Sequence, residues 1–219
     1  MSLLKSLLFC ATALPFAFST SVKADIFHWQ NQQEGISAAF PDRWHLETNL
    51  AYDEVFRISA PAVTDRFEDA QCRMRIRDDG RFKMHSVRNS GAIQRQHYGL
   101  EFWEHYLEDQ RHAAVNYVKN DTGVARGYAS MADLTFESFI QPRSIRRAIA
   151  FASHYQNRAY IVECSAEQAS FEKWYPSFMG IIKSVDFRSM TPFKNGAYRN
   201  FYGDELVVHG AREIDDYIF

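Results

Sequence analysis

Residues 71–77, QCRMRIR, alternate strictly between polar and apolar side chains, and this pattern constrains the fold more than any other stretch of the chain. The apolar set is Cys72, Met74 and Ile76, and the charged set is Arg73, Arg75 and Arg77. Successive side chains of a β-strand point to opposite faces of the sheet, so a strand separates the two sets completely. The stretch therefore predicts a half-buried strand with three arginines on one face.

Further strands are predicted from short apolar or alternating runs that are bounded by turn residues. We place them at residues 26–30, 34–40, 54–61, 115–119, 124–131, 134–140, 144–155 and 159–164. Only Gln156, Asn157 and Arg158 separate the last two runs. A connection of this length predicts an antiparallel hairpin.

Two segments change to a helical period. Between about residues 91 and 114, Leu100, Trp103 and Leu107 fall on one arc of a helix, and residues 170–184 repeat the pattern. The predicted fold class is α+β: an antiparallel β-sheet of about six to eight strands, flanked by two main helices.

The first residues read as an export signal. Lys5 precedes an apolar run at residues 6–18, and Val22 and Ala24 occupy the small-residue positions of a cleavage site. The run is shorter than the roughly 20 residues that span a bilayer, and we expect no transmembrane segment in the mature chain. The expected organisation is a signal peptide at 1–24, a single α+β domain at 25–188 and an aromatic tail at 189–219, in a periplasmic or secreted protein.

The net charge and the absence of known motifs argue against several classes of function. Removal of residues 1–24 takes away two lysines and no acid, so the formal net charge falls from −2 to −4, which does not suit a nucleic-acid binder. The chain has no G-x-S-x-G, P-loop or G-x-G-x-x-G motif, so no nucleophile elbow and no cofactor is expected. His154 is interpreted as a strand residue with one satisfied ring nitrogen rather than as a general base.

Cys72 and Cys164 are the two cysteines that remain after removal of the signal. An oxidising compartment favours a disulfide between them, and we predict that Cys164, placed where its strand stops, meets Cys72 across the core. The alternative is a pair of buried, reduced thiols that behave as small hydrophobic groups.

Arg73, Arg75 and Arg77 form a candidate anion-binding site, because the guanidinium fork bonds both oxygens of a carboxylate or phosphate. The alternative is the polar face of a sheet, neutralised by nearby acids. Many residues around this strand are charged and the chain as a whole is acidic, which favours that alternative.

A second candidate site consists of Glu101, His105, Glu108 and His112, which line one stripe of the first predicted helix. Imidazole and carboxylate groups at such spacing can hold zinc. The stripe lies opposite the apolar arc, however, so we expect a solvated face with Glu-His pairs and no structural metal.

The order of the elements and two short motifs resemble a known family. "ISAAFPDRW" near the start and "FEKWYPSFMGIIKSVDF" near the end are similar to the packing signatures of PsbP-like and DcrB-like proteins over roughly residues 34–188. The resemblance implies an α/β sandwich. It also implies an accessory or interaction role, often in an exported protein, without a common catalytic motif.

The tail continues beyond this resemblance and is rich in aromatic residues, unlike typical disordered segments. The candidate partner-binding residues are Tyr202, Leu206, Val207, Val208, Tyr217 and Phe219. Packing of the whole tail on its own sheet is the alternative.

Together these features predict an exported, non-catalytic binding or interaction module of the cell envelope, with an envelope protein as partner. The alternative is a hydrolase or metal-dependent enzyme, with a site of dispersed residues near the first helix. A catalytic role is not favoured by any motif of the chain.

Overall fold

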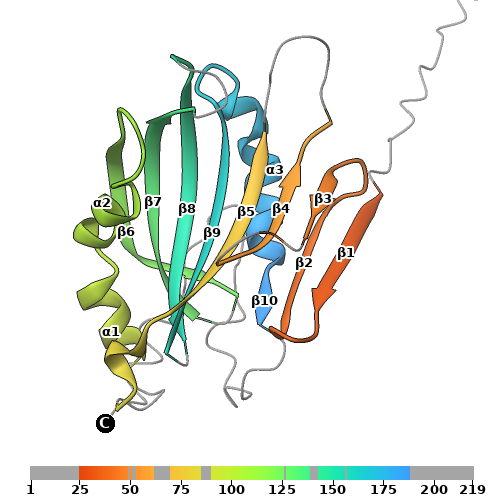
Figure 1. Ribbon diagram of the computed structural model, residues 1–219. Helices are drawn as coiled ribbons and strands as arrows, with labels where there is room; N and C mark the ends of the chain where they lie inside the picture. The colour runs from red at the N-terminus through yellow and green to blue at the C-terminus, as the bar shows by residue number, and fades with distance from the viewer. Residues whose placement is uncertain are drawn as a thin grey trace, which may run out of the picture.

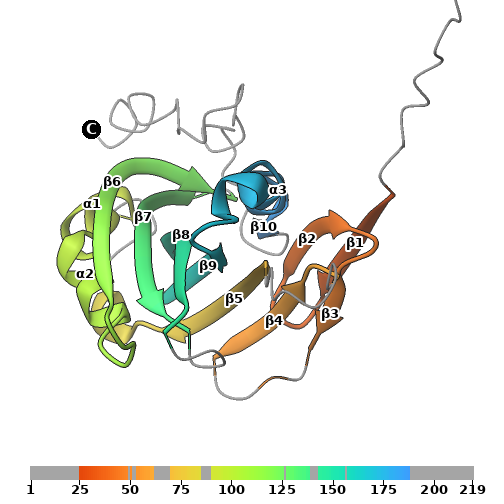
Figure 2. The same ribbon diagram turned by 90° about the horizontal axis from the view of Figure 1, so that it is seen from above.

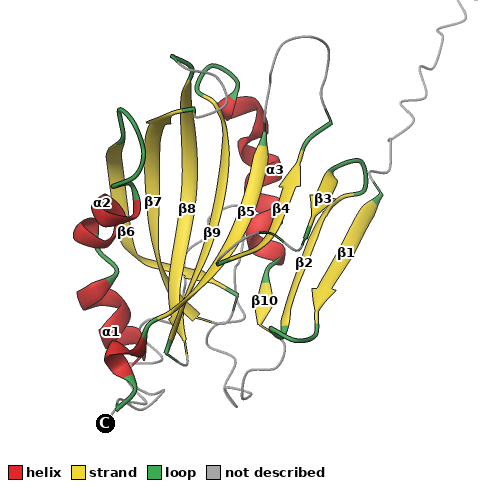
Figure 3. Cartoon of the chain, viewed as in Figure 1, coloured by secondary structure: helices red, strands yellow, loops and turns green. Residues whose placement is uncertain are grey.

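The computed structural model describes residues 25–187, apart from 49, 51–52, 62–69, 85–89, 126, 139–142 and 156. The predicted signal at 1–24 and the tail lie outside the described residues. In chain order the elements are β1 (Ile26–Asn31), β2 (Ile36–Pro41), β3 (His45–Glu47), β4 (Glu54–Ser59), β5 (Gln71–Asp78), η1 (Gly80–Phe82), α1 (Ser90–His97), α2 (Leu100–Tyr106), β6 (Ala114–Val124), β7 (Gly127–Glu137), β8 (Ile145–Tyr155), β9 (Arg158–Glu167), α3 (Phe171–Ser184) and β10 (Asp186–Phe187) (Figure 3).

The larger sheet has seven antiparallel strands in the order β3-β4-β5-β9-β8-β7-β6 (Figure 1). This confirms the predicted α+β class and the strand at residues 71–77. The predicted β8–β9 hairpin is also present, with Asn157 at φ 63° in its turn. The three strands expected between residues 115 and 140 are instead two long ones, joined by a turn at Ala125 with φ 55°.

A second, smaller sheet has the order β1-β2-β10, again antiparallel. It joins the start of the described chain to the residues that directly follow α3. Sequence periodicity predicted strands near β1 and β2 but did not separate them from the main sheet.

The two faces of the larger sheet carry separate apolar cores. On one face, α3 and the smaller sheet pack against side chains such as Phe56, Met74 and Val162. On the other face, α1 and α2 pack against β6–β9 through Trp103, Tyr106 and neighbouring residues. Figure 2 shows α3 on one side of these strands and α1 and α2 on the other. Within the described residues, no helix is both long and apolar enough to cross a bilayer.

The single helix expected at residues 91–114 is wrong. The chain forms two short helices that are interrupted at Tyr98 and Gly99, and it has become strand β6 by Ala114. The buried Tyr98 hydroxyl donates to Asp79 at 2.7 Å, and Gly99 has an extended backbone at the start of α2. This tertiary hydrogen bond accompanies a break that helical periodicity alone does not reveal.

Small side chains let α1 and α2 lie close to the sheet. The residues beneath them include Ala132, Ala148, Ala150, Ala152 and Ala159. Gln94 of α1 reaches the edge of β8, where its amide donates to the Ala152 carbonyl and accepts from the His154 N–H. Trp103 of α2 donates to the Ser130 hydroxyl at 2.8 Å. These polar contacts position the helices on the sheet.

Cys72 and Cys164 form a disulfide in the structure. They lie opposite each other on neighbouring strands of one sheet, with their Cα atoms 4.0 Å apart, and not across the core. Cys164 also does not end its strand, because β9 continues to Glu167. The expectation about the strand end was wrong because Ser165 and Ala166, although small, are buried and paired with β8.

Candidate functional site

Arg73, Arg75 and Arg77, which we call the arginine row, project from β5 toward the face of the sheet that carries α1 and α2. Cys72 and Met74 project to the opposite face and are fully buried. The exposed fraction of the side chain increases along the row, from 14% at Arg73 to 21% at Arg75 and 41% at Arg77. One end of the row is therefore buried and the other is accessible.

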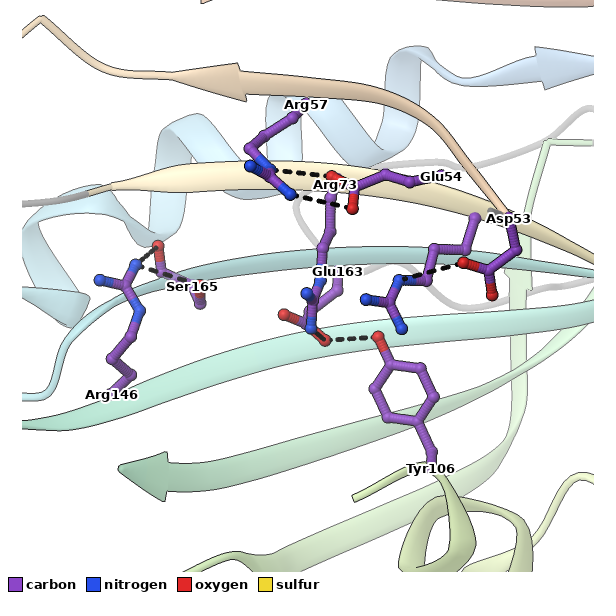
Figure 4. A network of polar contacts seen from close by, with 9 residues as sticks. Asp53, Glu54, Arg57, Arg73, Tyr106, Arg146, Glu163 and Ser165 are labelled. Atoms are coloured by element: carbon purple, nitrogen blue, oxygen red, sulfur yellow. Dashed lines mark hydrogen bonds and ion pairs between the residues drawn. The ribbon is translucent and has the colours of Figure 1, made fainter. Parts of the chain in front are cut away.

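The buried end is a polar network around Glu163 of β9. Glu163 is 2% exposed, and its Oε2 accepts from Arg73 Nη2 at 2.9 Å and from the Tyr106 hydroxyl at 2.6 Å. Figure 4 shows Tyr106 pointing from α2 toward this carboxylate. The network connects α2 to the central strands of the sheet.

Opposite charges keep this network ionised despite its burial. Burial disfavours the Glu163 carboxylate, but the charge and hydrogen bond of Arg73 and the hydrogen bond of Tyr106 outweigh it and lower the pKa of Glu163. Burial likewise opposes the charge of Arg73, but Glu163 raises the pKa of Arg73 overall. Burial and the neighbouring carboxylate both raise the pKa of Tyr106, so its hydroxyl stays protonated as a donor.

Asp53 and Tyr106 organise the exposed end of the row. Asp53 accepts from Arg77 Nε and lies 3.8 Å from Arg75 Nε. The guanidinium groups of Arg75 and Arg77 lie 5.8 and 5.6 Å from the centre of the Tyr106 ring. Such cation–π contacts and ion pairs hold the two groups in defined positions.

A line of four charged residues, with an acid at each end and two arginines between them, crosses four strands at the level of Arg73. Glu47, Arg57, Arg73 and Glu163 are direct cross-strand neighbours on β3, β4, β5 and β9. Like charges directly opposite each other are unfavourable in a sheet. Arg57 and Arg73 tolerate their position because Arg57 also binds Glu54, at 2.8 and 3.0 Å, while Arg73 binds Glu163. Acids thus neutralise much of the row, and its anion-binding role stays a prediction.

Two hollows meet at Arg77. A groove of about 910 Å³ lies between β1, β4 and β5 and is lined by charged residues, among them Asp53, Arg75 and Arg158. A cleft of about 720 Å³ lies between the end of β5 and the α1–α2 link. Arg77 and the neighbouring Asp78 line both, so the exposed end of the row borders the groove as well as the cleft.

Arg81 provides a second fixed cation in the cleft. Its guanidinium donates twice to Asp79, at 2.7 Å each, and Tyr98 donates to the same carboxylate. Burial raises the pKa of Asp79, but the hydrogen bonds from Arg81 and Tyr98 outweigh it and lower the pKa to about 2. Asp79 is therefore a permanent anion that orients Arg81, whose side chain is 60% exposed.

His154 lies buried beside this cleft. Its ring packs edge-on against Phe82, at 5.0 Å between centres, and near Tyr98. Neither ring nitrogen has a hydrogen-bond partner of good geometry among the described residues, although the Asp79 backbone lies close to the ring, so the structure does not show the expected satisfied nitrogen. Burial lowers the pKa of His154. The imidazole is consequently neutral at pH 7.

The predicted stripe on the first helix is not one surface. Glu101 and His105 lie on α2, whereas Glu108 follows its end and His112 sits in a turn with φ 46°. His105 pairs with Glu108 at 2.8 Å, and His112 lies 3.7 Å from Glu137 of β7. Both histidine side chains are exposed, and the described part of the chain contains no group of three or more potential metal ligands.

The predicted partner-binding residues of the tail, from Tyr202 to Phe219, lie outside the described residues. The structure therefore does not place them near the arginine row or away from it. Sequence reasoning also missed Asp53, Asp79, Tyr106 and Glu163, which organise the row and the cleft. Glu163 had one signal, an acid within an otherwise apolar strand, "AYIVEC".

No protein-family model matches the chain, and neither does any curated protein. Solved structures with a similar arrangement include PsbP (CyanoP) of Synechocystis sp. PCC 6803, with 8% identity and a TM-score of 0.46 over 75% of this chain and 93% of its own. PA94 of Pseudomonas aeruginosa, a protein of unknown function and putative regulator in its description, has 9% identity and a TM-score of 0.44 over 73% and 94%. LpqN of Mycobacterium tuberculosis, described as involved in cell envelope biogenesis, has 10% identity and a TM-score of 0.43 over 74% and 90%. At these identities and TM-scores the structures share a similar arrangement of elements and assign no role to this chain.

Proposed function

We propose that this protein is an exported, non-catalytic binding module of the cell envelope that recognises an anionic partner at the exposed end of the arginine row. The observation that carries the proposal is the position of Arg77, which is held by Asp53, is 41% exposed and borders both the groove and the cleft. The disulfide supports an extracytoplasmic location, because such bonds persist in oxidising compartments.

The three arginines have different parts in this proposal. Arg73 is largely buried and committed to Glu163, so it supports the strand and does not contact a partner. Arg77 uses one donor nitrogen on Asp53 and can present the others to solvent. A guanidinium that is already fixed loses little conformational entropy when it binds a carboxylate or phosphate.

Arg81 extends the same surface across the cleft. Asp79 holds it in place, as Asp53 holds Arg77, and both guanidinium groups line the cleft. Two fixed cations that line the same cleft suit a partner that carries carboxylate or phosphate groups in sequence, such as an acidic segment of an envelope protein.

Site-specific photo-crosslinking tests this function in the native envelope. A benzoylphenylalanine at Leu100, an exposed residue that lines the cleft, should crosslink the exported protein to its partner. The double variant Arg77→Gln/Arg81→Gln should lose the product, and raised salt should weaken it because exposed charges are screened. The matched control is Arg147→Gln on β8. Arg147 is likewise an arginine held by acidic residues, here Asp133 and Glu172, but it stacks on Phe171 of α3 and is not among the residues that line the cleft.

Two results would overturn the proposal. One is a crosslink that survives the double variant as well as it survives Arg147→Gln. The other is a cellular protein that still begins at Met1 and stays in the cytoplasm, rather than an exported chain that begins at Asp25. Melting temperatures of all variants show whether a lost crosslink reflects unfolding.

A further inference from the structure

Strand β1 is the outer strand of the smaller sheet and is largely exposed. It pairs with β2 on one side, and no other strand of the described chain pairs with its outer side, as its position in Figure 1 shows. Its sequence, IFHWQN, has no lysine, arginine, acid or proline. Ile26 and Phe27 are 62% and 43% exposed. Natural sheets usually shield such an edge with charges, proline or bulges.

The two edges of the larger sheet carry the protection that β1 lacks. β3 is three residues long and ends in Glu47, so it offers little backbone for pairing. β6 has two irregularities in its register and carries Lys119 and Asp121. Bulges and charges of this kind discourage further pairing. Among the described strands, β1 is thus the edge most suited to accept another strand.

The path of the chain indicates what covers this edge. Phe187, the last residue of β10, lies opposite Ile36, which in turn lies opposite Asn31 at the end of β1. The chain therefore leaves the smaller sheet at the end where a strand antiparallel to β1 must enter. The distance from β10 past β2 and β1 is about three strand spacings, or about 14 Å.

We propose that residues 205–209, ELVVH, pair antiparallel with the outer edge of β1 as a fourth strand of the smaller sheet. Residues 188–204 connect β10 to this segment and can reach roughly 50 Å when extended, far more than the crossing requires. The segment is rich in β-branched residues and lies between Gly203 and Gly210, as strands between turns often do. Its apolar side chains would cover Ile26 and Phe27. The proposal assigns Leu206, Val207 and Val208 to the chain's own sheet and leaves Tyr217 and Phe219 for a partner.

Residue-resolved hydrogen exchange of the whole mature chain tests this pairing. Every second amide of β1 points away from β2, and these outward amides should exchange slowly because the added strand accepts from them. Proline has no N–H to donate to the ladder. Of the two variants Val207→Pro and Val208→Pro, the one whose lost N–H points toward β1 should weaken the pairing and raise the exchange rates of the outward β1 amides by about tenfold. Ala197→Pro in the connecting segment is the matched control and should leave β1 unchanged.

Each other outcome contradicts the proposal. Fast exchange of the outward β1 amides in the unaltered chain would show that the edge is open. Slow exchange that survives both proline variants would show that something else covers it. Protection that appears only at concentrations where sedimentation detects a dimer would assign the edge to a second copy of the chain. The amides of β8, deep in the larger sheet, report whether each variant remains folded.

Discussion

Cys72 and Cys164 face each other on β5 and β9, and the next residue pair along the same two strands is Arg73 and Glu163. The disulfide lies on the α3 face of the sheet and the ion pair lies on the α2 face, because successive side chains alternate. A shift of one residue in this register would turn the arginine row into the apolar core. The covalent bond and the ion pair therefore specify the same alignment.

The double variant Cys72→Ala/Cys164→Ala should unfold more easily than the natural chain. The disulfide closes a loop with a sequence separation of 92 residues, and chain-entropy arguments give about 4–5 kcal/mol of stabilisation for such a loop. Urea unfolding at neutral pH measures the difference. Dithiothreitol should lower the unfolding midpoint of the natural chain without affecting the double variant. A free energy of unfolding that differs by less than about 1 kcal/mol between the double variant and the natural chain would contradict this entropic role.

Glu163→Gln should lower the free energy of unfolding by about 3–5 kcal/mol, because it leaves the Arg73 charge buried without its counter-charge. Thermal and urea unfolding both report the change. The companion variant Arg73→Met/Glu163→Leu removes both charges and should recover most of the loss. If the double variant is as unstable as Glu163→Gln, the cost arises from packing around β9 or from the Tyr106 hydroxyl, which loses its acceptor, rather than from an unpaired charge.

Stability should fall as the pH is lowered below about 6.5, and His154 should account for part of that loss. Burial lowers the pKa of His154 below its ordinary value of 6.5, so the unfolded chain takes up a proton at a higher pH than the folded chain. Protonation therefore favours unfolding in this window, and His154 contributes stability at higher pH. Urea unfolding between pH 8 and pH 5 measures the slope.

His154→Phe tests the assignment, since phenylalanine can occupy the same aromatic surroundings without titrating. The groups that face His154 are Asp79, Arg81, Phe82, His97 and Tyr98. The stabilising effect of the Asp79 charge is lost only as the pH falls from about 3.8 toward about 2, well below the window in question. An unchanged slope between pH 7 and pH 5 in His154→Phe would assign the loss to another group.

His105→Ala/His112→Ala should leave the thermal stability nearly unchanged, because the two side chains are 75% and 79% exposed. His105 pairs with the exposed Glu108, and the buried Glu137 that lies 3.7 Å from His112 also accepts from the Arg143 N–H. Substitutions of this kind usually change stability by less than about 0.5 kcal/mol. Calorimetry measures the melting temperature, and metal analysis of the purified protein provides an independent check. A large drop in melting temperature, or stoichiometric zinc, would instead support the metal-dependent alternative.

Patterns within single segments were enough to predict much of the secondary structure. The alternation at residues 71–77, the β8–β9 hairpin and the helix near residues 170–184 were all recognisable, because each depends on neighbours a few residues apart. The same alternation placed the three arginines on one face. The presence of just two cysteines outside the predicted signal at 1–24 also predicted their pairing.

Tertiary contacts decided what local patterns could not. The helix is interrupted at Tyr98, where a buried side-chain hydrogen bond to Asp79, 19 positions earlier, ties the link between α1 and α2 to the end of β5. The first two strands join β10 in a separate sheet through pairs that are about 150 residues apart. Glu163 neutralises Arg73 from 90 positions away, and Tyr106 brings α2 to the same carboxylate. The sequence by itself determined which side chains share a face of a strand, because the alternation of side chains is local. The partner of each buried charge depends on which strands and helices lie next to each other, and only the tertiary structure decided that.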